Sequence, residues 1–428
     1  MKVFPEALLH YLWKFRLFDN QNLLSTEGDL IEIEQVGQHN LRDAGPDFSD
    51  ARIRINDTLW AGQVEIHKLA SDWERHQHNV DAAYDTVVLH VVYEYDKPIY
   101  RLDGSLIPTL ALKDRIAPEI IERSANLLDS LELVACRTEI NKVPGFMVNM
   151  WLERLVIERL EDKTEAIQRE LAFNKNNWES TFYIFLARNF GTPVNAEPFE
   201  QLARSLPLLA LAKHKNKLLQ LEAMLFGQAG FLEGDFKTDY PLLLQREYKI
   251  LRQKFELTPI NGAAWKFGRM RPAAFPTIRI ALFAQLIHQS SHLFSKLLET
   301  EEIKNFQDYF ELKVSDYWLS HYRFEDDTAK RQQKSLGKNT FYNIAINTLV
   351  PFLFVYGKSI QEERYCERAL RWLEQIDAED NAIIKMWKDI GIEAQSAYQT
   401  QALLQLKKQY CDQKHCLDCA IGNKILRG

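Results

Sequence analysis

The sequence predicts a mixed α/β domain over residues 1–115, followed by a large all-α region over residues 116–428. Two patterns indicate this division. Short β-branched or alternating apolar runs, separated by Asn, Asp, Gly and Pro, are confined to the first part. Beyond residue 115 the strand patterns stop, and apolar residues recur at the 3.6-residue spacing of amphipathic helices. We therefore expect a sheet-containing domain and then a helical region.

The first part opens with a predicted helix and continues mainly as strands. In residues 4–18, "FPEALLHYLWKFRLF", Leu8, Leu9 and Leu12 fall on one helical face. A second helix is predicted over residues 71–85, "SDWERHQHNVDAAYD", because a Ser-Asp pair opens it as a cap. The strands are expected at residues 30–37, 51–57, 59–67, 86–96, 98–104 and 106–112.

The second part is expected to be helical almost throughout. Its polar stretch, residues 312–341, is predicted as a loop, and no fixed internal repeat is evident. The clearest helical spacing is found in residues 147–171, 185–190, 241–257 and 275–303.

Composition limits the classes of function. The chain has 428 residues, of which 46% are apolar, and this is enough for two or three globular cores. A formal net charge of −6 argues against a surface that coats nucleic acid throughout, and leaves room for a local basic groove. Because no uninterrupted apolar stretch of about 18 residues and no signal peptide is evident, we expect a cytoplasmic protein without a membrane partner.

Two carboxylates and a histidine form the first candidate site. "GQVEIH" ends a predicted strand, and side chains alternate along a strand, so Glu65 and His67 share one face. Asp47 follows a Gly-Pro turn, and hairpin pairing of residues 51–57 with 59–67 would bring it beside Glu65. Carboxylates on neighbouring strands are hard ligands suited to Mg²⁺ or Mn²⁺. Such an ion can orient a water and neutralise charge on a phosphate oxygen.

The spacing of "AGPDF" and "GQVEIH" resembles the motif of the PD-(D/E)XK nuclease superfamily. The resemblance covers the first domain and implies a restriction-endonuclease-like mixed sheet. It implies Asp47 and Glu65 as catalytic metal ligands, His67 in the place of the lysine that positions or activates water, and Glu6 as a further acidic residue on the first helix. The activity it implies is hydrolysis of phosphodiester bonds in DNA or RNA. His67 departs from the motif, because a neutral imidazole supplies no fixed positive charge.

Other interpretations of this site stay open. Asp47 could cap a turn while Glu65 pairs with Arg52 or Arg54 and His67 is an ordinary sheet histidine. A non-catalytic nucleic-acid-binding protein or protein-interaction scaffold would keep the fold with a degenerate site. A zinc hydrolase is disfavoured, because histidines two apart on a helix do not face one ion. It would draw on four histidines of this domain, His67, His76, His78 and His90.

The cysteines form a second candidate site. "YCDQKHCLDCAIG" holds Cys411, Cys416 and Cys419 in a C-x4-C-x2-C pattern, and either Cys136 or His415 could supply a fourth ligand. Zinc and an iron–sulfur cluster are both compatible with four such ligands. Some nucleases of the RecB type are similar in joining a terminal cysteine trio to one remote cysteine, although the order of site and cysteines differs here. Reduced thiols packed as small apolar residues are the structural alternative, and we expect Cys366 to be an ordinary helix residue.

A basic and aromatic stretch, "WKFGRMRPAAFPTIRIA", is the candidate contact with nucleic acid. Cations interleaved with aromatic rings can hold phosphates and stack bases, and they can equally pair with acidic helices inside an α-helical array. The cations are Lys266, Arg269, Arg271 and Arg279.

Over nearly its full length the chain resembles an uncharacterised bacterial family designated as a domain of unknown function. The stretches that carry this likeness include "AGPDF", "GQVEIH", "DWERHQHN", "LARNFGTPVNAEPFE", "RMRPAAFPTIRIA" and "CLDCAIGNKIL". The resemblance supports the architecture and brings no activity of its own.

Overall fold

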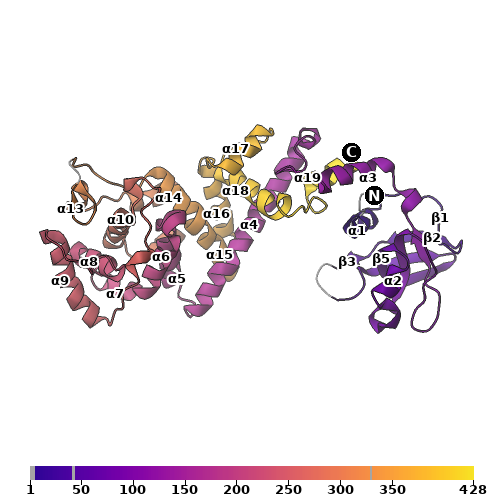
Figure 1. Ribbon diagram of the computed structural model, residues 1–428, viewed down its shortest axis with the longest axis horizontal. Helices are drawn as coiled ribbons and strands as arrows, with labels where there is room; N and C mark the ends of the chain where they lie inside the picture. Colours follow the sequence, from indigo (N-terminus) through magenta and orange to yellow (C-terminus); the bar gives the residue numbers. More distant parts are fainter. Residues whose placement is uncertain (1–4, 41–43, 328–329) are drawn as a thin grey trace. The chain divides into compact units, whose positions relative to one another are not determined.

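The computed structural model describes residues 5–40, 44–327 and 330–428, which form two compact units (Figure 1). Unit 1 takes in the described residues of Met1–Leu152 together with Asp389–Gly391 and Leu406–Gly428. Unit 2 consists of the described residues of Glu153–Lys388 and of Ile392–Gln405. The chain therefore leaves unit 1 within a helix and returns to it at its end.

The N-terminal part of unit 1 is a mixed sheet with helices, as predicted. Helix α1 (Glu6–Lys14) precedes β1 (Leu23–Leu24), β2 (Leu30–Gln35), β3 (Gln38–His39), β4 (Phe48–Ile55) and β5 (Thr58–Leu69). After β5 come α2 (Asp72–Arg75), the 3-10 turns η1 (His78–Val80) and η2 (Ala82–Tyr84), β6 (Val87–Glu94), β7 (Thr109–Ala111) and η3 (Lys113–Arg115).

The sheet runs in the order β1-β2-β4-β5-β6-β7, and β3 pairs with β4 beside it. Strands β1 to β5 pair antiparallel, whereas β5, β6 and β7 are parallel. A parallel neighbour needs a crossover connection, and the segment from α2 to η2 supplies it between β5 and β6. This arrangement places the start of β4 beside the C-terminal half of β5, which in turn pairs with β6.

Helix α1 and the crossover cover the sheet with apolar side chains. Leu8, Leu9 and Leu12 of α1 are buried, and the helix packs on β5. Trp73 of α2 is also fully buried, in a cluster with Val87 and other core residues. Strand β6, "VVLHVVYE", is buried along most of its length, which explains its nearly continuous apolar sequence.

Two predicted elements of this part are wrong in detail. Residues 98–104 form no strand but only an isolated bridge between Tyr100 and Leu106. The helix expected over residues 71–85 is broken into α2 and two 3-10 turns, because Gln77 adopts a left-handed conformation with φ 64°. The break determines where the histidines of this segment point.

The rest of unit 1 is helical. Helix α3 (Pro118–Leu128), the turn η4 (Ile140–Lys142) and the start of α4 (Gly145–Phe173) follow the sheet. From the end of the chain come the π-helix η9 (Leu406–Cys411) and α19 (Ala420–Arg427), and α19 packs on α3.

Unit 2 contains the remaining helices, and the predicted all-α character holds with one exception. The polar stretch 312–341 forms a small hairpin, β8 (His321–Arg323) with β9 (Asp326–Asp327), where only a loop was expected. The α-helices lying wholly in this unit are α5 (Trp178–Phe190), α6 (Thr192–Ser205), α7 (Leu208–Ala212), α8 (Leu218–Gln228), α9 (Asp239–Lys254), α10 (Pro276–Gln289), α11 (Leu293–Glu299), α12 (Ile303–Gln307), α13 (Tyr317–Ser320), α14 (Lys338–Ile344), α15 (Val350–Ile360), α16 (Glu363–Gln375) and α18 (Ala397–Gln405); α17 (Ala382–Asp389) ends at its boundary.

One helical run of the described residues, Lys338–Ile360, is long and apolar enough by length and composition alone to cross a membrane. Of its most apolar window, 72% is buried within the protein. A core helix shows the same combination of length, composition and burial.

Candidate metal centre

The carboxylates of Asp47 and Glu65 lie side by side where β4 pairs with β5. Phe48 is the partner of Val64 in the antiparallel register, so Asp47 and Glu65 are neighbours across the strands. The Asp47 N–H donates to Glu65 Oε2 at 3.0 Å, and the Ile66 N–H donates to Asp47 Oδ2 at 2.9 Å. Each side chain is thus held by the other strand's backbone, in the proximity that the hairpin register predicts.

The structure forms no ion pair between the described residues Glu65 and Arg52 or Arg54, the pairs expected if the site were an ordinary part of the sheet. Arg54 pairs with Glu32 at 3.6 Å and with Glu34 at 2.5 Å, both on β2, instead of with Glu65. Among the described residues, the side chains within ion-pair distance of Glu65 are those of His67 and His78.

His67 extends the site along β5. Its Nε2 lies 3.5 Å from Glu65 Oε1, and its Nδ1 lies 2.8 Å from Nε2 of His90 on β6. Both imidazoles are buried, with exposures of 1% and 0%. Because His90 engages Nδ1 of His67, Nε2 is the nitrogen that faces the carboxylate and can bind an ion.

Two more imidazoles reach the site from the crossover. His76 follows the last residue of α2, His78 begins η1, and the left-handed Gln77 between them turns both rings toward β5. His76 Nδ1 lies 3.1 Å from His67 Nε2, and His78 Nε2 lies 3.2 Å from Glu65 Oε1. The expectation that histidines two apart cannot face one ion is wrong here, because that argument holds only within a continuous helix.

The ligand atoms of His67, His76 and His78 all lie within 4.8 Å of one another. Glu65 Oε1 adds an oxygen to the three nitrogens. Such a set fits a transition-metal dication better than Mg²⁺, which prefers oxygen ligands. His76 is exposed, so solvent reaches the centre on that side.

Burial controls protonation at the centre. Desolvation, followed by the charges of His78 and His76, lowers the pKa of His67 to about 3, and burial holds the pKa of His90 well below its usual value. Both rings are therefore neutral near pH 7, the state that metal ligation requires. Burial, aided by the charge of Asp47, also raises the pKa of Glu65 in spite of the hydrogen bond from His78. A bound cation would favour its ionised form.

His10 is a residue of the site that the sequence patterns do not single out. Its Nε2 lies 3.3 Å from Asp47 Oδ2. Burial lowers the pKa of His10, but the hydrogen bond and charge of Asp47 outweigh this effect and leave the pKa raised. The charge of Glu6, one helical turn earlier, adds to the rise. Among the described residues no hydrogen bond or ion pair joins Glu6 to Asp47 or Glu65. The spacing of Glu6 and His10 on a predicted helix is the signal that could have found His10.

The cysteines predicted as ligands converge in unit 1. Burial, and then neighbouring thiols, raise the pKa of Cys136 to about 12, and burial raises that of Cys419 to about 11. His415, the local alternative, is exposed and does not line the same space. Cys366 lies apart in α16 of unit 2, where its thiol donates to the Phe354 carbonyl. One small cavity is lined by Cys136, Cys411, Cys416 and Cys419.

The basic stretch of unit 2 is only partly at the surface. Lys266, Arg269 and Arg271 are exposed, whereas Arg279 is 8% exposed within α10. Its guanidinium donates to Thr340 Oγ1 at 3.1 Å. Arg279 therefore does not belong to an exposed basic surface, because apolar helical spacing in "FPTIRIALFAQLIHQ" turns it into the core.

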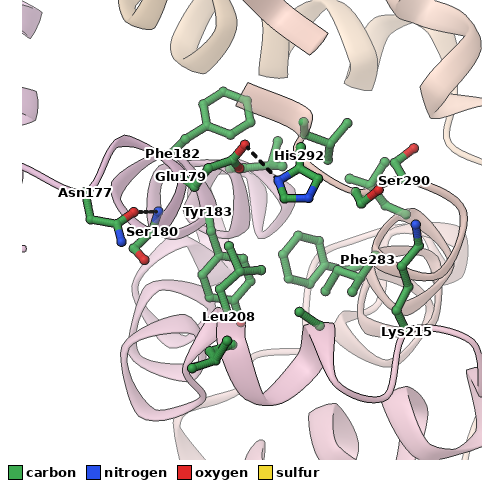
Figure 2. A pocket seen from close by; sticks show the side chains of 17 residues that line it. Asn177, Glu179, Ser180, Phe182, Tyr183, Leu208, Lys215, Phe283, Ser290 and His292 are labelled. Atoms are coloured by element: carbon green, nitrogen blue, oxygen red, sulfur yellow. Dashed lines mark hydrogen bonds and ion pairs between the residues drawn. The ribbon is translucent and has the colours of Figure 1, made fainter. Parts of the chain in front are cut away.

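A larger pocket of unit 2 is apolar (Figure 2). Phe182 and Tyr183 of α5 and Phe283 of α10 line it, and the rings of Tyr183 and Phe283 stack with their centroids 5.8 Å apart. At the rim, Glu179 lies 3.9 Å from His292. None of the residues predicted for the candidate sites lines this pocket, and its apolar walls bring no set of metal ligands together.

A family model described as "Protein of unknown function (DUF2851)" matches residues 6–382. No curated protein and no solved structure shows significant similarity to the chain. The match includes every residue of the candidate metal centre and Cys136, and it ends before the cysteine trio.

Proposed function

The chain belongs to the DUF2851 family of proteins of unknown function, and from its own geometry we propose that it is a metal-dependent hydrolase of phosphodiester bonds in DNA or RNA. One observation carries the proposal. The Glu65 carboxylate and three imidazoles, drawn from β5 and the crossover between β5 and β6, converge on one partly open centre, and Asp47 lies beside Glu65.

The donor set favours Mn²⁺ or Zn²⁺ over Mg²⁺. Glu65 would bind through Oε1 and the histidines through the ring nitrogens that face it, and these are the ligands that such dications accept. A bound dication would lower the pKa of a coordinated water and neutralise charge on a phosphate oxygen. The ligand residues are Glu65, His67, His76 and His78.

The other residues of the centre hold these ligands in place. His90 fixes the ring of His67 through the 2.8 Å contact with Nδ1, so that Nε2 points inward. Asp47 accepts from the β5 backbone and faces His10, which leaves its carboxylate beside the centre as a second acidic group. In this position Asp47 can accept a proton from a water or bind a second ion.

The choice of phosphodiesters rests on the motif and the topology. The resemblance to PD-(D/E)XK nucleases implies a mixed sheet, and this domain has one, with Asp47 just before β4 and Glu65 on the neighbouring β5. The neutral His67 departs from the lysine of that motif. We propose that it serves as a metal ligand and that the ion supplies the positive charge.

The test combines metal binding with hydrolysis. Chelator-treated protein is titrated with Mn²⁺, Zn²⁺ and Mg²⁺ by calorimetry, and hydrolysis of single- and double-stranded DNA and RNA is then measured with each ion. We expect Mn²⁺ or Zn²⁺ to bind more tightly than Mg²⁺, and Glu65→Gln to reduce both binding and hydrolysis at least about 100-fold. Glu32→Gln, an exposed carboxylate on β2 of the same sheet, is the matched control. Hydrolysis that survives in Glu65→Gln would overturn the proposal.

A non-catalytic nucleic-acid-binding protein is the second candidate, and one observation favours it. The position that holds lysine in the resembling nucleases carries a buried neutral imidazole. This candidate expects salt-sensitive oligonucleotide binding without hydrolysis, and that binding should be weakened by neutralising Lys266, Arg269 and Arg271 and be unaffected by Glu65→Gln. A protein with neither binding nor hydrolysis would instead be a protein-interaction scaffold.

A further inference from the structure

The cysteine cavity is separate from the proposed hydrolytic centre and is built from two distant parts of the chain. Cys136 lies in the segment between α3 and η4, whereas Cys411 ends η9, and Cys416 and Cys419 lie between η9 and α19. All four thiols line one small cavity, and Cys416 and Cys419 are buried with exposures of 9% and 7%. Most of the intervening chain forms unit 2, so the cavity joins the first and last pieces of unit 1.

The backbone around these cysteines is shaped to present sulfur atoms to the cavity. Cys419 is the residue before α19, and the backbone N–H groups of Gly422 and Ile421 lower the pKa of its thiol against the larger, raising effect of burial. A side chain at Gly422 would place a Cβ 2.1 Å from the Cys416 carbonyl oxygen, so only glycine permits this approach. Backbone N–H groups at a helix start stabilise a thiolate, and hydrogen bonds to ligand sulfur tune metal clusters.

The spacing of the thiols favours one of the two centres, a zinc ion or an iron–sulfur cluster, that four cysteines can bind. A single Zn²⁺ with bonds of about 2.3 Å draws its four sulfurs to about 3.8 Å from one another. No three of the four cysteine sulfurs, all in the described part of the chain, lie within 4.8 Å of one another. In an iron–sulfur cluster the thiolates bind different iron atoms and are therefore spread more widely.

We propose that Cys136, Cys411, Cys416 and Cys419 bind an iron–sulfur cluster that fastens the C-terminal segment to the residues around Cys136. Contacts beside the cavity connect the same two pieces of chain. The Lys414 ammonium donates to the Ser130 carbonyl, and the Arg123 guanidinium donates to the Leu426 carbonyl at 3.4 Å. His415 is exposed and has no part in ligation.

Metal and sulfide content of the full chain tests the assignment. The protein is purified without oxygen, and iron, zinc and acid-labile sulfide are measured together with visible absorption and electron paramagnetic resonance after reduction. We expect iron and sulfide in equal amounts, about two or four of each per chain. One zinc per chain without sulfide, or no bound metal, would overturn the proposal, and this measurement needs no variant.

Variants then test the ligands. Cys136→Ser and Cys416→Ser should each lower iron content at least tenfold and speed proteolytic removal of the segment after Gln405. His415→Ala and Cys366→Ser are the matched controls, since the first is the local alternative and the second is the cysteine of unit 2. Retention of full iron content by Cys136→Ser, or an equal loss in Cys366→Ser, would contradict the assigned ligands.

Discussion

Burial favours the neutral form of polar side chains in both units, with different consequences. In unit 1, burial keeps His67 and His90 neutral, so His67 can bind an ion and His90 can hold its ring in place without either first losing a proton. In unit 2, Glu222 of α8 is 1% exposed and accepts a hydrogen bond from Ser315 Oγ at 2.8 Å. Its charge has no cationic partner among the described residues. Burial accordingly raises the pKa of Glu222 from 4.5 to about 7.

This shift predicts a pH dependence of stability for unit 2. The folded state holds the Glu222 proton more tightly than the unfolded chain, so the stabilisation is complete below pH 4.5 and is lost as pH rises through about 7. We expect Glu222→Gln to remove this loss, so that the variant gains about 3 kcal/mol over the native chain between pH 4.5 and pH 8. Urea unfolding of both proteins across this range measures the gain. Glu233→Gln, at an exposed glutamate, should show none, and parallel curves for Glu222→Gln and native protein would contradict the assignment.

At the scale of elements, a single backbone conformation assembles the candidate metal centre. Helix α2 stops after one turn, and Gln77 enters the left-handed region, which places His76 and His78 on the same side. A β-branched residue is strongly disfavoured there, whereas glycine adopts this conformation freely. Gln77→Val should therefore weaken Mn²⁺ or Zn²⁺ binding about tenfold, since strain of about 1–2 kcal/mol opposes the turn. Gln77→Gly should bind as the native protein does. Calorimetric titration compares them, and equal affinities of the valine and glycine variants would refute the role of this turn.

The same turn shows which part of the candidate site sequence patterns do not predict. Alternating apolar residues predict β2, β4, β5 and β6, and the hairpin register predicts that Asp47 meets Glu65. Nothing in "ERHQHN" signals a left-handed residue, because glutamine is not a usual choice for it. The convergence of His76 and His78 therefore depends on the packing of the crossover. The burial of Arg279 is not predicted for a related reason, since a basic motif does not show which helix face is buried.

Across the whole molecule, the chain builds unit 1 from both of its ends and unit 2 from the stretch between. Both proposed metal sites lie in unit 1, whereas Glu222 and the apolar pocket lie in unit 2. Each unit buries its own apolar core, so perturbing one should leave the cooperative unfolding of the other largely unchanged. Loss of the C-terminal segment should consequently damage unit 1 more than unit 2.

Calorimetric melting of the metal-loaded protein should therefore show two transitions with separate sensitivities. A ligand that binds only the folded state stabilises it by about 2.7 kcal/mol at a hundredfold excess over Kd, so removal of metal by a chelator should lower the transition of unit 1 by several degrees. Glu222→Gln at pH 8 should raise only the other transition, because its gain arises within unit 2. Since α4 runs through the boundary between the units, a fully coupled molecule would instead melt in one step. A single transition, or equal shifts of both transitions on chelation, would show that the two cores unfold as one.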